Sequence, residues 1–458
     1  MQRPVNQMSH VEILKQQLPS LDWITEDKEI EKLSKDYYWF SPLLKLELDS
    51  KRADAVVRPR TREELATVVS ECAKTRTPIT MRGAGTGNYG QAIPLKGGVV
   101  IDMTAMNRIV SVKRGMATVE AGCKLLVLEQ AANDAGFEQR TYPSTFRMAT
   151  VGGLFGGGFG GVGSINFGPI YAPGNVLAIN VMTVSESPDI IELTGDECLA
   201  LAHAYGTNGV IVELTIALAK WQHWNEACVS FQRFADAMRF GAELTASPGI
   251  LKKQCGVFAS SFTKYMPLLK KRIAVDLPYS ICLIQDSSES PFRDLVTKHG
   301  GQVTHWGSAG SAALAGRYIH EFCWNHTTMH VLRLDSSFTY LQCLLNDPVK
   351  QARALYDELN PRVMMHFEFI RNAEGAVACG GLPVLQFESK AQIDRDIATF
   401  ESHGAFVMNP HVYEVEEGNS RQIDPRQVAA KERFDPLGLL NPGKLRGWNA
   451  RAHAQRSK

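Results

Sequence analysis

The sequence lacks the closely spaced cysteine pairs that disulfide-rich and zinc-binding domains need. Its nine cysteines are scattered along 458 residues, with no Cys-x-x-Cys pair. It also lacks an apolar segment near the N-terminus and any apolar run long enough to span a membrane. We therefore expect reduced cysteines, a cytoplasmic location and no membrane span.

An excess of either charge is absent too. Lys and Arg number 49, Asp and Glu number 48, and the two signs are interspersed, so the formal net charge is +1. Nucleic-acid-binding proteins and polybasic membrane anchors need a concentrated positive surface. We therefore expect no nucleic-acid partner, and the length is that of a two-domain protein.

Glycine is abundant, and it is concentrated in one segment. Eight of the fourteen residues from Thr150 to Gly163 are glycine. Because glycine loses the most conformational freedom when it is ordered, such a run needs a physical reason. Flexible linkers carry serine and charge, whereas this segment carries Leu154, Phe155 and Phe159. The pattern favours a ligand-binding wall, whose backbone lies against a flat molecule or offers N–H groups to anions.

The remaining pattern predicts two domains that each mix helix and strand. In the first, we expect strands at 55–59, 78–81, 98–102 and 117–121, and helices after a capping box at 61–64 and at 124–135. In the second, we expect strands at 229–234, 279–285, 327–334, 363–369 and 404–409, and helices at 292–299, 348–359 and 391–403. The predicted domain bounds are 1–220 and 221–420, with 421–458 returning to the first domain.

The segment Gly85-Thr-Gly-Asn-Tyr-Gly90 matches the glycine pattern of dinucleotide-binding folds. A Rossmann site requires that pattern to open a helix. Here the chain continues into Gln-Ala-Ile-Pro-Leu-Lys-Gly-Gly, which cannot form one. The pattern therefore indicates either an ordinary turn or a loop of N–H groups after a strand, able to cradle a pyrophosphate.

Four motifs follow one another in a characteristic order: Arg82-Gly-Ala-Gly-Thr-Gly, Thr150-Val-Gly-Gly, Gly206-Thr-Asn-Gly-Val-Ile-Val-Glu-Leu-Thr215, and Phe434-Asp-Pro with Asn441-Pro-Gly-Lys. This order resembles the FAD-linked oxidoreductases whose flavin domain is of the vanillyl-alcohol-oxidase, or PCMH, type. The resemblance covers about 55–220 and the last twenty-odd residues. It implies an α+β fold, with a two-subdomain FAD-binding domain and a sheet-and-helix cap domain for the substrate.

The resemblance also implies which residues contact FAD. Backbone amides of the loop after residue 82 would bind the pyrophosphate, and several separated stretches would line the rest of the extended cofactor. The implied set is Gly83, Ala84, Gly85, Thr86, Gly87, Gln91, Pro143, Ser144, Thr150, Val151, Gly152, Gly153, Gly157, Gly158, Gly161, Val210, Ile211 and Asn441. Thr86 stands where some members carry a histidine bound covalently to the flavin, so we expect non-covalent FAD.

In such enzymes the cap domain is expected to supply the group that removes a substrate proton. Taken as strands, segments 324–334, 363–369 and 406–414 each place histidine on one polar face. These faces predict a wet cavity over the flavin. The candidate catalytic residues are His326, His366, His411 and Tyr413. Surface histidines or hydrogen-bonded core histidines are the alternative interpretation.

A metal site is another use for these histidines. His326-Thr-Thr-Met-His330 has zinc-like helical spacing without the glutamate beside the first histidine, and Glu368 could join a divalent-ion site. The family's 2-hydroxy-acid dehydrogenases instead carry a Gly-Asp-Gly-Asn segment with flanking histidines and a Glu-His-Gly-Ile-Gly segment. Both segments are missing. Their absence counts against a glycolate- or lactate-type substrate, and we expect no metal.

These observations predict an FAD-dependent oxidoreductase that oxidises an alcohol-type carbon of a small organic substrate by hydride transfer to flavin. The alternatives are a 2-hydroxy-acid dehydrogenase with a rebuilt site and a non-catalytic FAD-holding subunit of an electron-transfer complex. The electron acceptor, whether oxygen, a quinone or a carrier protein, is left open, as is a homodimer.

Overall fold

The computed structural model describes residues 10–310, 314, 316–418 and 420–450. Its first part holds a four-stranded sheet in the order β1-β2-β4-β3, with β2, β4 and β3 parallel. The strands are β1 (Trp23–Ile24), β2 (Ala55–Val57), β3 (Ile79–Arg82) and β4 (Val99–Asp102). The helices of this part are α1 (His10–Gln17), α2 (Asp27–Leu33), α3 (Pro42–Leu48) and α4 (Arg62–Thr75).

Helix α4 confirms the Thr61 half of the predicted capping box, whereas the Glu64 carboxylate accepts from the backbone N–H of Arg60 (2.7 Å) and not from that of Thr61. The Thr61 hydroxyl accepts a hydrogen bond from the backbone N–H of Glu64 (3.2 Å), which satisfies one free donor of the first turn. The apolar stripe of α4 is buried and packs beneath the parallel strands. This βαβ unit ends at Arg82, and it places the glycine loop 83–87 at the carboxyl end of β3.

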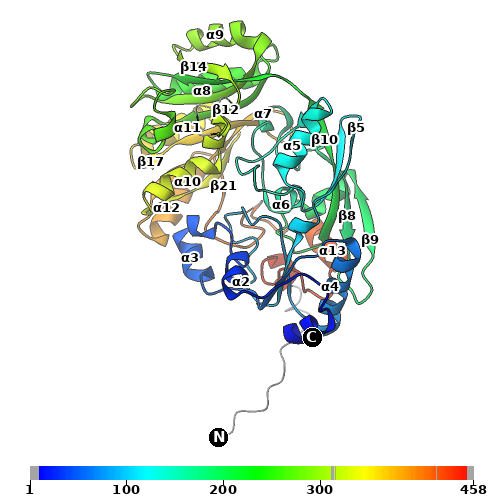
Figure 1. Ribbon diagram of the computed structural model, residues 1–458. Helices are drawn as coiled ribbons and strands as arrows, with labels where there is room; N and C mark the ends of the chain where they lie inside the picture. Colours follow the sequence, from blue (N-terminus) through cyan, green and yellow to red (C-terminus); the bar gives the residue numbers. More distant parts are fainter. Residues whose placement is uncertain (1–9, 311–313, 315, 419, 451–458) are drawn as a thin grey trace.

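A second, antiparallel sheet completes the flavin-binding part predicted from the sequence, on the right in Figure 1. Its order is β5-β6-β10-β8-β9, and β7 also pairs with β10. The strands are β5 (Ile109–Lys113), β6 (Met116–Glu120), β7 (Phe137–Gln139), β8 (Val176–Met182), β9 (Ile190–Thr194) and β10 (Val210–Lys220). The helices are α5 (Leu125–Asp134), α6 (Val151–Gly157) and α7 (Ser164–Phe167).

The glycine-rich segment is not extended throughout, because its first half forms α6. Thr150 caps this helix by accepting a hydrogen bond from the N–H of Gly153 (3.2 Å). Leu154 and Phe155 on the helix are buried in the core, and glycines occupy its other face. Further on, Gly161 lies so close to the preceding segment that a Cβ would come within 1.9 Å of a backbone carbonyl.

The third sheet has eight antiparallel strands in the order β14-β11-β13-β12-β18-β19-β16-β21. The strands are β11 (Trp224–Ser230), β12 (Lys252–Phe258), β13 (Tyr279–Gln285), β14 (Gln302–Ser308), β16 (Gln342–Leu345), β18 (His366–Arg371), β19 (Val377–Gly381) and β21 (Phe406–Met408). A small sheet contains β15 (Phe338–Tyr340), β17 (Val363–Met364) and β20 (Val384–Gln386). The helices are α8 (Phe234–Ala246), α9 (Glu289–Lys298), α10 (Asn325–Leu334), α11 (Pro348–Leu359) and α12 (Lys390–Ser402).

Most of the elements predicted for this second half are confirmed, and two predictions need correction. The predicted strand 229–234 lies earlier, as β11. The predicted strand 327–334 is wrong, because this segment is the helix α10. Its buried residues Thr327, Thr328, Val331 and Leu332 follow helical spacing, which the β-branched threonines and valine obscured in the sequence.

The end of the chain returns to the first sheet. Helix α13 (Pro425–Phe434) packs against the 3-10 helix η3 (Gly195–Leu201). The backbone after α13 then forms two hydrogen bonds with that of Ile79 on β3. The N–H of Ile79 donates to the carbonyl of Leu439 (2.8 Å), and the N–H of Asn441 donates to the carbonyl of Ile79 (2.7 Å). The division into 1–220, 221–420 and 421–458 stays our proposal, and this return agrees with it.

Two further features bear on the predictions. All nine cysteines are buried and free. Within the described ranges, no helix combines the length and the apolar character needed to cross a bilayer. The short 3-10 helices of the connections are η1 (Tyr38–Phe40), η2 (Met103–Ala105), η4 (Ser260–Tyr265), η5 (Pro267–Leu269), η6 (Asp286–Ser288) and η8 (Ile319–Phe322).

Candidate active site

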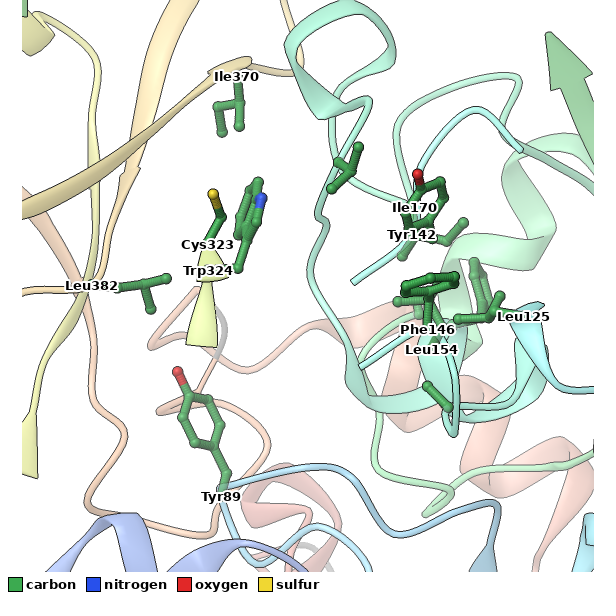
Figure 2. Packing of buried hydrophobic residues seen from close by; sticks show 14 of the residues in the cluster. Tyr89, Leu125, Tyr142, Phe146, Leu154, Ile170, Cys323, Trp324, Ile370 and Leu382 are labelled. Carbon is green, nitrogen blue, oxygen red and sulfur yellow. The ribbon is translucent and has the colours of Figure 1, made fainter. Parts of the chain in front are cut away.

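A cavity of about 480 Å³ lies where the glycine loops of the first half face the third sheet and α10. One side is built from the loop 83–92, the segment 143–149, α6 and the loop 203–211. The other side is built from residues on 317–333, β16 and β19, together with Leu382 and Met408. Figure 2 shows three of the lining residues, with Leu154 on one side and Trp324 and Leu382 on the other.

The loop after β3 has the geometry expected of a phosphate cradle. Gly85 has a φ of +65°, and a Cβ there would lie 2.0 Å from the Arg82 guanidinium. Arg82 donates to the backbone carbonyl of Lys35 (2.7 Å) and lines the cavity, so its positive charge lies beside the loop. Backbone N–H groups with an adjacent guanidinium are suited to a pyrophosphate.

Gln91 joins this loop to the glycine helix. Its Nε2 donates to the carbonyl of Gly157 at the end of α6 (2.6 Å). Its Oε1 is buried and has no hydrogen-bond partner among the residues that the structure describes. Because buried polar atoms normally have partners, this oxygen fits a polar ligand in the cavity.

Helix α6 presents an open glycine face to the cavity. A Cβ on Gly156 would meet nothing nearer than a carbon of Ile211 at 4.0 Å. A cofactor can therefore approach the helix backbone directly, as the glycine content predicts. The cradle, the partnerless Gln91 oxygen and this flat wall together fit an FAD molecule.

The structure brings most of the predicted cofactor residues to one cavity. Those that line it are Gly83, Ala84, Gly85, Thr86, Gly87, Gln91, Pro143, Ser144, Thr150, Gly152, Gly153, Gly157, Gly158 and Ile211. Val151, Gly161, Val210 and Asn441 are absent from its lining. Val151 and Val210 are core residues. Asn441 acts behind the site, because its side-chain amide donates to the carbonyls of Gln91 (2.8 Å) and Tyr205 (2.7 Å).

Sequence reasoning missed His203 and Tyr205, which line the cavity next to the glycine helix. Both have left-handed backbones, with φ of 49° and 55°. Their backbone N–H groups donate to the carbonyls of Phe155 (2.9 Å) and Gly156 (2.8 Å), so α6 holds them in place. Such strained residues cluster at functional sites. In the sequence, the motif that begins at Gly206 indicated a tight loop next to these two residues, and we found no other signal for them.

Two histidines of α10 line the other side of the cavity, four residues apart on one helix face. His326 Nδ1 lies 2.9 Å from the backbone carbonyl of Glu321. This contact requires a proton on Nδ1, which leaves Nε2 as the hydrogen-bond acceptor. Burial lowers the pKa of His326, so the ring is neutral near pH 7. Burial likewise lowers the pKa of His330, to about 4.

Two arginines lie at the same end of the cavity. Arg317 and Arg333 line it, and both lower the pKa of the two α10 histidines. Neither guanidinium has a hydrogen-bond or ion-pair partner within the part of the chain that the structure describes. Arg147, also in the lining, is in contrast paired with Glu321 (2.8 Å).

The other three candidate catalytic residues lie outside the cavity lining, so the predicted cluster of His326, His366 and His411 does not form. His366 is fully buried, stacks on Phe258 and contacts Glu368 (2.7 Å). His411 Nδ1 contacts the hydroxyl of Ser41, the cap of α3 (2.7 Å), and burial lowers its pKa to about 4.

Tyr413 packs in a small apolar cluster with residues of α3. The prediction of a shared polar face assumed that His326 and His411 lie on strands. It failed because His326 lies on helix α10 and residue 411 follows strand β21. Across the described ranges, no group of three or more His, Cys, Asp or Glu side chains is arranged to hold a metal ion.

Comparisons with known proteins identify an FAD-binding domain in this chain. Residues 53–187 match the family model for an FAD binding domain. An uncharacterised FAD-linked oxidoreductase of Mycobacterium tuberculosis is 25% identical over 435 residues, covering 85% of this chain and 90% of that protein. Glycolate oxidase subunit GlcD of Escherichia coli is 28% identical over 225 residues, covering 47% of this chain and 42% of that subunit.

A solved structure of alkyldihydroxyacetonephosphate synthase has the same fold, with a TM-score of 0.72 at 16% identity over 97% of this chain and 86% of that chain. The chain therefore contains an FAD-binding domain of the predicted type, its relatives include FAD-linked oxidoreductases, and its cofactor is FAD.

We expect this FAD to be held without a covalent bond. The loop 83–92 contains neither histidine nor cysteine, and Thr86 takes the position of the family's tethering histidine. Acid precipitation of the purified yellow protein should release all flavin into the supernatant. A yellow pellet would contradict this prediction and would direct attention to a tether from another part of the cavity.

Proposed function

We propose that this protein oxidises a CH–OH group of a small organic substrate by hydride transfer to FAD, with His326 as the proton acceptor. The observation that carries the proposal is the His326 ring in the cavity wall. Its Nδ1 is engaged by the Glu321 carbonyl, and its lowered pKa keeps Nε2 free to accept a proton. Bound FAD supplies the acceptor for the hydride.

The residues that line the cavity give its two walls different roles. The loops of the first half bind and orient the cofactor through Arg82, Gln91 and the backbone of α6. Helix α10 carries the acid–base group of the opposite wall, and its N-terminal cap residue, Trp324, is buried in the same wall. A neutral imidazole can take the hydroxyl proton as the C–H bond is broken.

A 2-hydroxy acid is the second candidate substrate, and Arg317 and Arg333 are the observation that favours it. Two guanidinium groups without described partners, close to His326, are suited to a carboxylate. The partial relatives named as glycolate oxidase subunit and D-lactate dehydrogenase agree with this candidate, although the metal-binding segments of that group are missing here.

Anaerobic titration of the yellow protein with neutral alcohols and 2-hydroxy acids tests both candidates. We expect at least one donor to bleach the flavin absorbance. If the effective donor is an acid, Arg333→Met should raise its KM at least about tenfold, because a charge-assisted hydrogen bond is lost. Neutral donors should be unaffected by this substitution. Failure of every donor in the panel to reduce the flavin would contradict the proposed function.

A further inference from the structure

Helix α6 ends with four backbone carbonyls that have no partner within the helix. The N–H of Gly158 donates to the carbonyl of Leu154 (2.8 Å), so the carbonyls of residues 155–158 are left over. All four are nevertheless paired, by groups from the two loops beside the helix. Their partners are, in order, the N–H of His203 (2.9 Å), the N–H of Tyr205 (2.8 Å), Gln91 Nε2 (2.6 Å) and His203 Nδ1 (3.0 Å). The two loops therefore fix the end of the glycine helix.

One side chain of the C-terminal segment joins these two loops. Asn441 is 1% exposed, and its Nδ2 donates to the carbonyls of Gln91 (2.8 Å) and Tyr205 (2.7 Å). An amide nitrogen carries two N–H groups, so one is used on each loop. Gln91 and Tyr205 are also residues that bond to the end of α6. The Asn441 amide thus lies directly behind both contacts with the helix.

Asparagine is unfavourable at position 441 apart from these two bonds. Asn441 has a φ of +40°, which glycine adopts more readily. Its Oδ1 is buried and has no hydrogen-bond partner in the described part of the chain. Backbone strain and an unsatisfied oxygen both destabilise the folded state. The bonds from Nδ2 are therefore the feature that favours asparagine here over glycine.

The two loops depend on Asn441 to different degrees. Lys444 is fully buried, and its Nζ donates to the carbonyls of Gly90 (2.6 Å), Gln91 (2.8 Å) and Ile93 (2.7 Å). The Gln91 carbonyl thus keeps a donor if the Asn441 amide is removed. No second donor to the Tyr205 carbonyl is found among the described residues. Removal of the amide should therefore loosen the segment that contains His203 and Tyr205.

We infer that Asn441 is a positioning residue for the cofactor. Its amide holds the 203–205 segment against the end of α6, and so fixes the glycine face that is open to FAD, although Asn441 itself is absent from the cavity lining. A wall that is already ordered binds a ligand more tightly than one that must be ordered on binding. This role concerns the cofactor alone, so it holds whichever substrate is oxidised.

Asn441→Gly removes the amide and suits the left-handed backbone, so the fold should be kept. The rise of flavin fluorescence after dilution of the FAD-loaded protein gives the rate of FAD release. We expect release to be roughly tenfold faster, the effect of about one lost hydrogen bond. Hydrogen exchange of the FAD-loaded protein gives a second measurement. Amides 203–207 should exchange faster, whereas amides 90–93, which Lys444 still holds, should exchange as in the wild type.

Two further variants decide the result. Arg76 is exposed, has a φ of 56° and ends α4 outside the cavity, so Arg76→Gly makes the same backbone change and should release FAD as the wild type does. Asn441→Asp tolerates the backbone and cannot donate two hydrogen bonds, so it replaces Asn441→Gly if that variant does not fold. Release at the wild-type rate in the folded variant would overturn the role of Asn441. Equal acceleration of exchange at 203–207 and 90–93 would also overturn it, because it would indicate a general loss of stability.

Discussion

Gly85→Asp is expected to yield a folded, colourless protein. Position 85 has a φ of +65°, which aspartate tolerates better than most residues, so folding is retained. The built Cβ lies 2.0 Å from the Arg82 guanidinium, so that flexible side chain must move aside, and the new carboxylate would lie where the pyrophosphate is bound. Two like charges 4 Å apart repel by about 4 kcal/mol near a protein surface, roughly a thousandfold in Kd. Flavin absorbance per protein after purification measures the effect.

A second glycine separates the charge effect from backbone strain. Gly136 has a φ of +81°, lies outside the cavity lining and has open space around its Cβ position. Gly136→Asp therefore imposes the same left-handed strain with the same charge, and it should purify yellow. Normal flavin occupancy in Gly85→Asp would place the phosphates elsewhere. Loss of flavin in both variants would point to folding rather than to the phosphate loop.

The flavin half of the site could be predicted from the sequence because its signals are local. Glycine runs and Thr61 specify backbone conformation within a few residues, and the loop after β3 lines the cavity as expected. Long periodic segments of the cap half were predicted for the same reason. Helix α11 matches its predicted bounds at both ends.

The substrate half could not be predicted, since its assembly depends on contacts distant in sequence. Glu368 holds the backbone of Trp324 from 44 residues away, and no local pattern indicates that contact. His366 belongs to the same buried group, although its polar neighbours suggested a wet surface. Which residues share a face with His326 also depends on the type of element. On a strand every second residue shares a face, whereas on a helix residues three or four positions apart do.

His326→Asn is expected to slow flavin reduction by substrate about 10²–10⁴-fold, the usual cost of removing a positioned general base. Asparagine can keep a donor near the Glu321 carbonyl, so helix α10 and the flavin colour should be preserved. In the wild type, the neutral ring is needed, and it predominates above its pKa. Because burial lowers that pKa from about 6.5, the rate should hold constant through neutral pH and fall only in acid. Anaerobic stopped-flow measurements of flavin bleaching against pH give both quantities.

Two other histidines provide the controls for this assignment. His411→Asn lies outside the cavity and should leave the reduction rate and its acid limb unchanged. His330→Asn changes the neighbouring ring on the same helix face, which has no engaged Nδ1 contact comparable to that of His326. A large loss in His330→Asn with normal rates in His326→Asn would transfer the base to His330. The pH at which the wild-type reduction rate falls in acid also distinguishes the two histidines, because burial lowers the pKa of His330 to about 4. A proton acceptor on α10 thus predicts both which variant is slow and how its pH profile changes, whereas a purely structural histidine would alter neither.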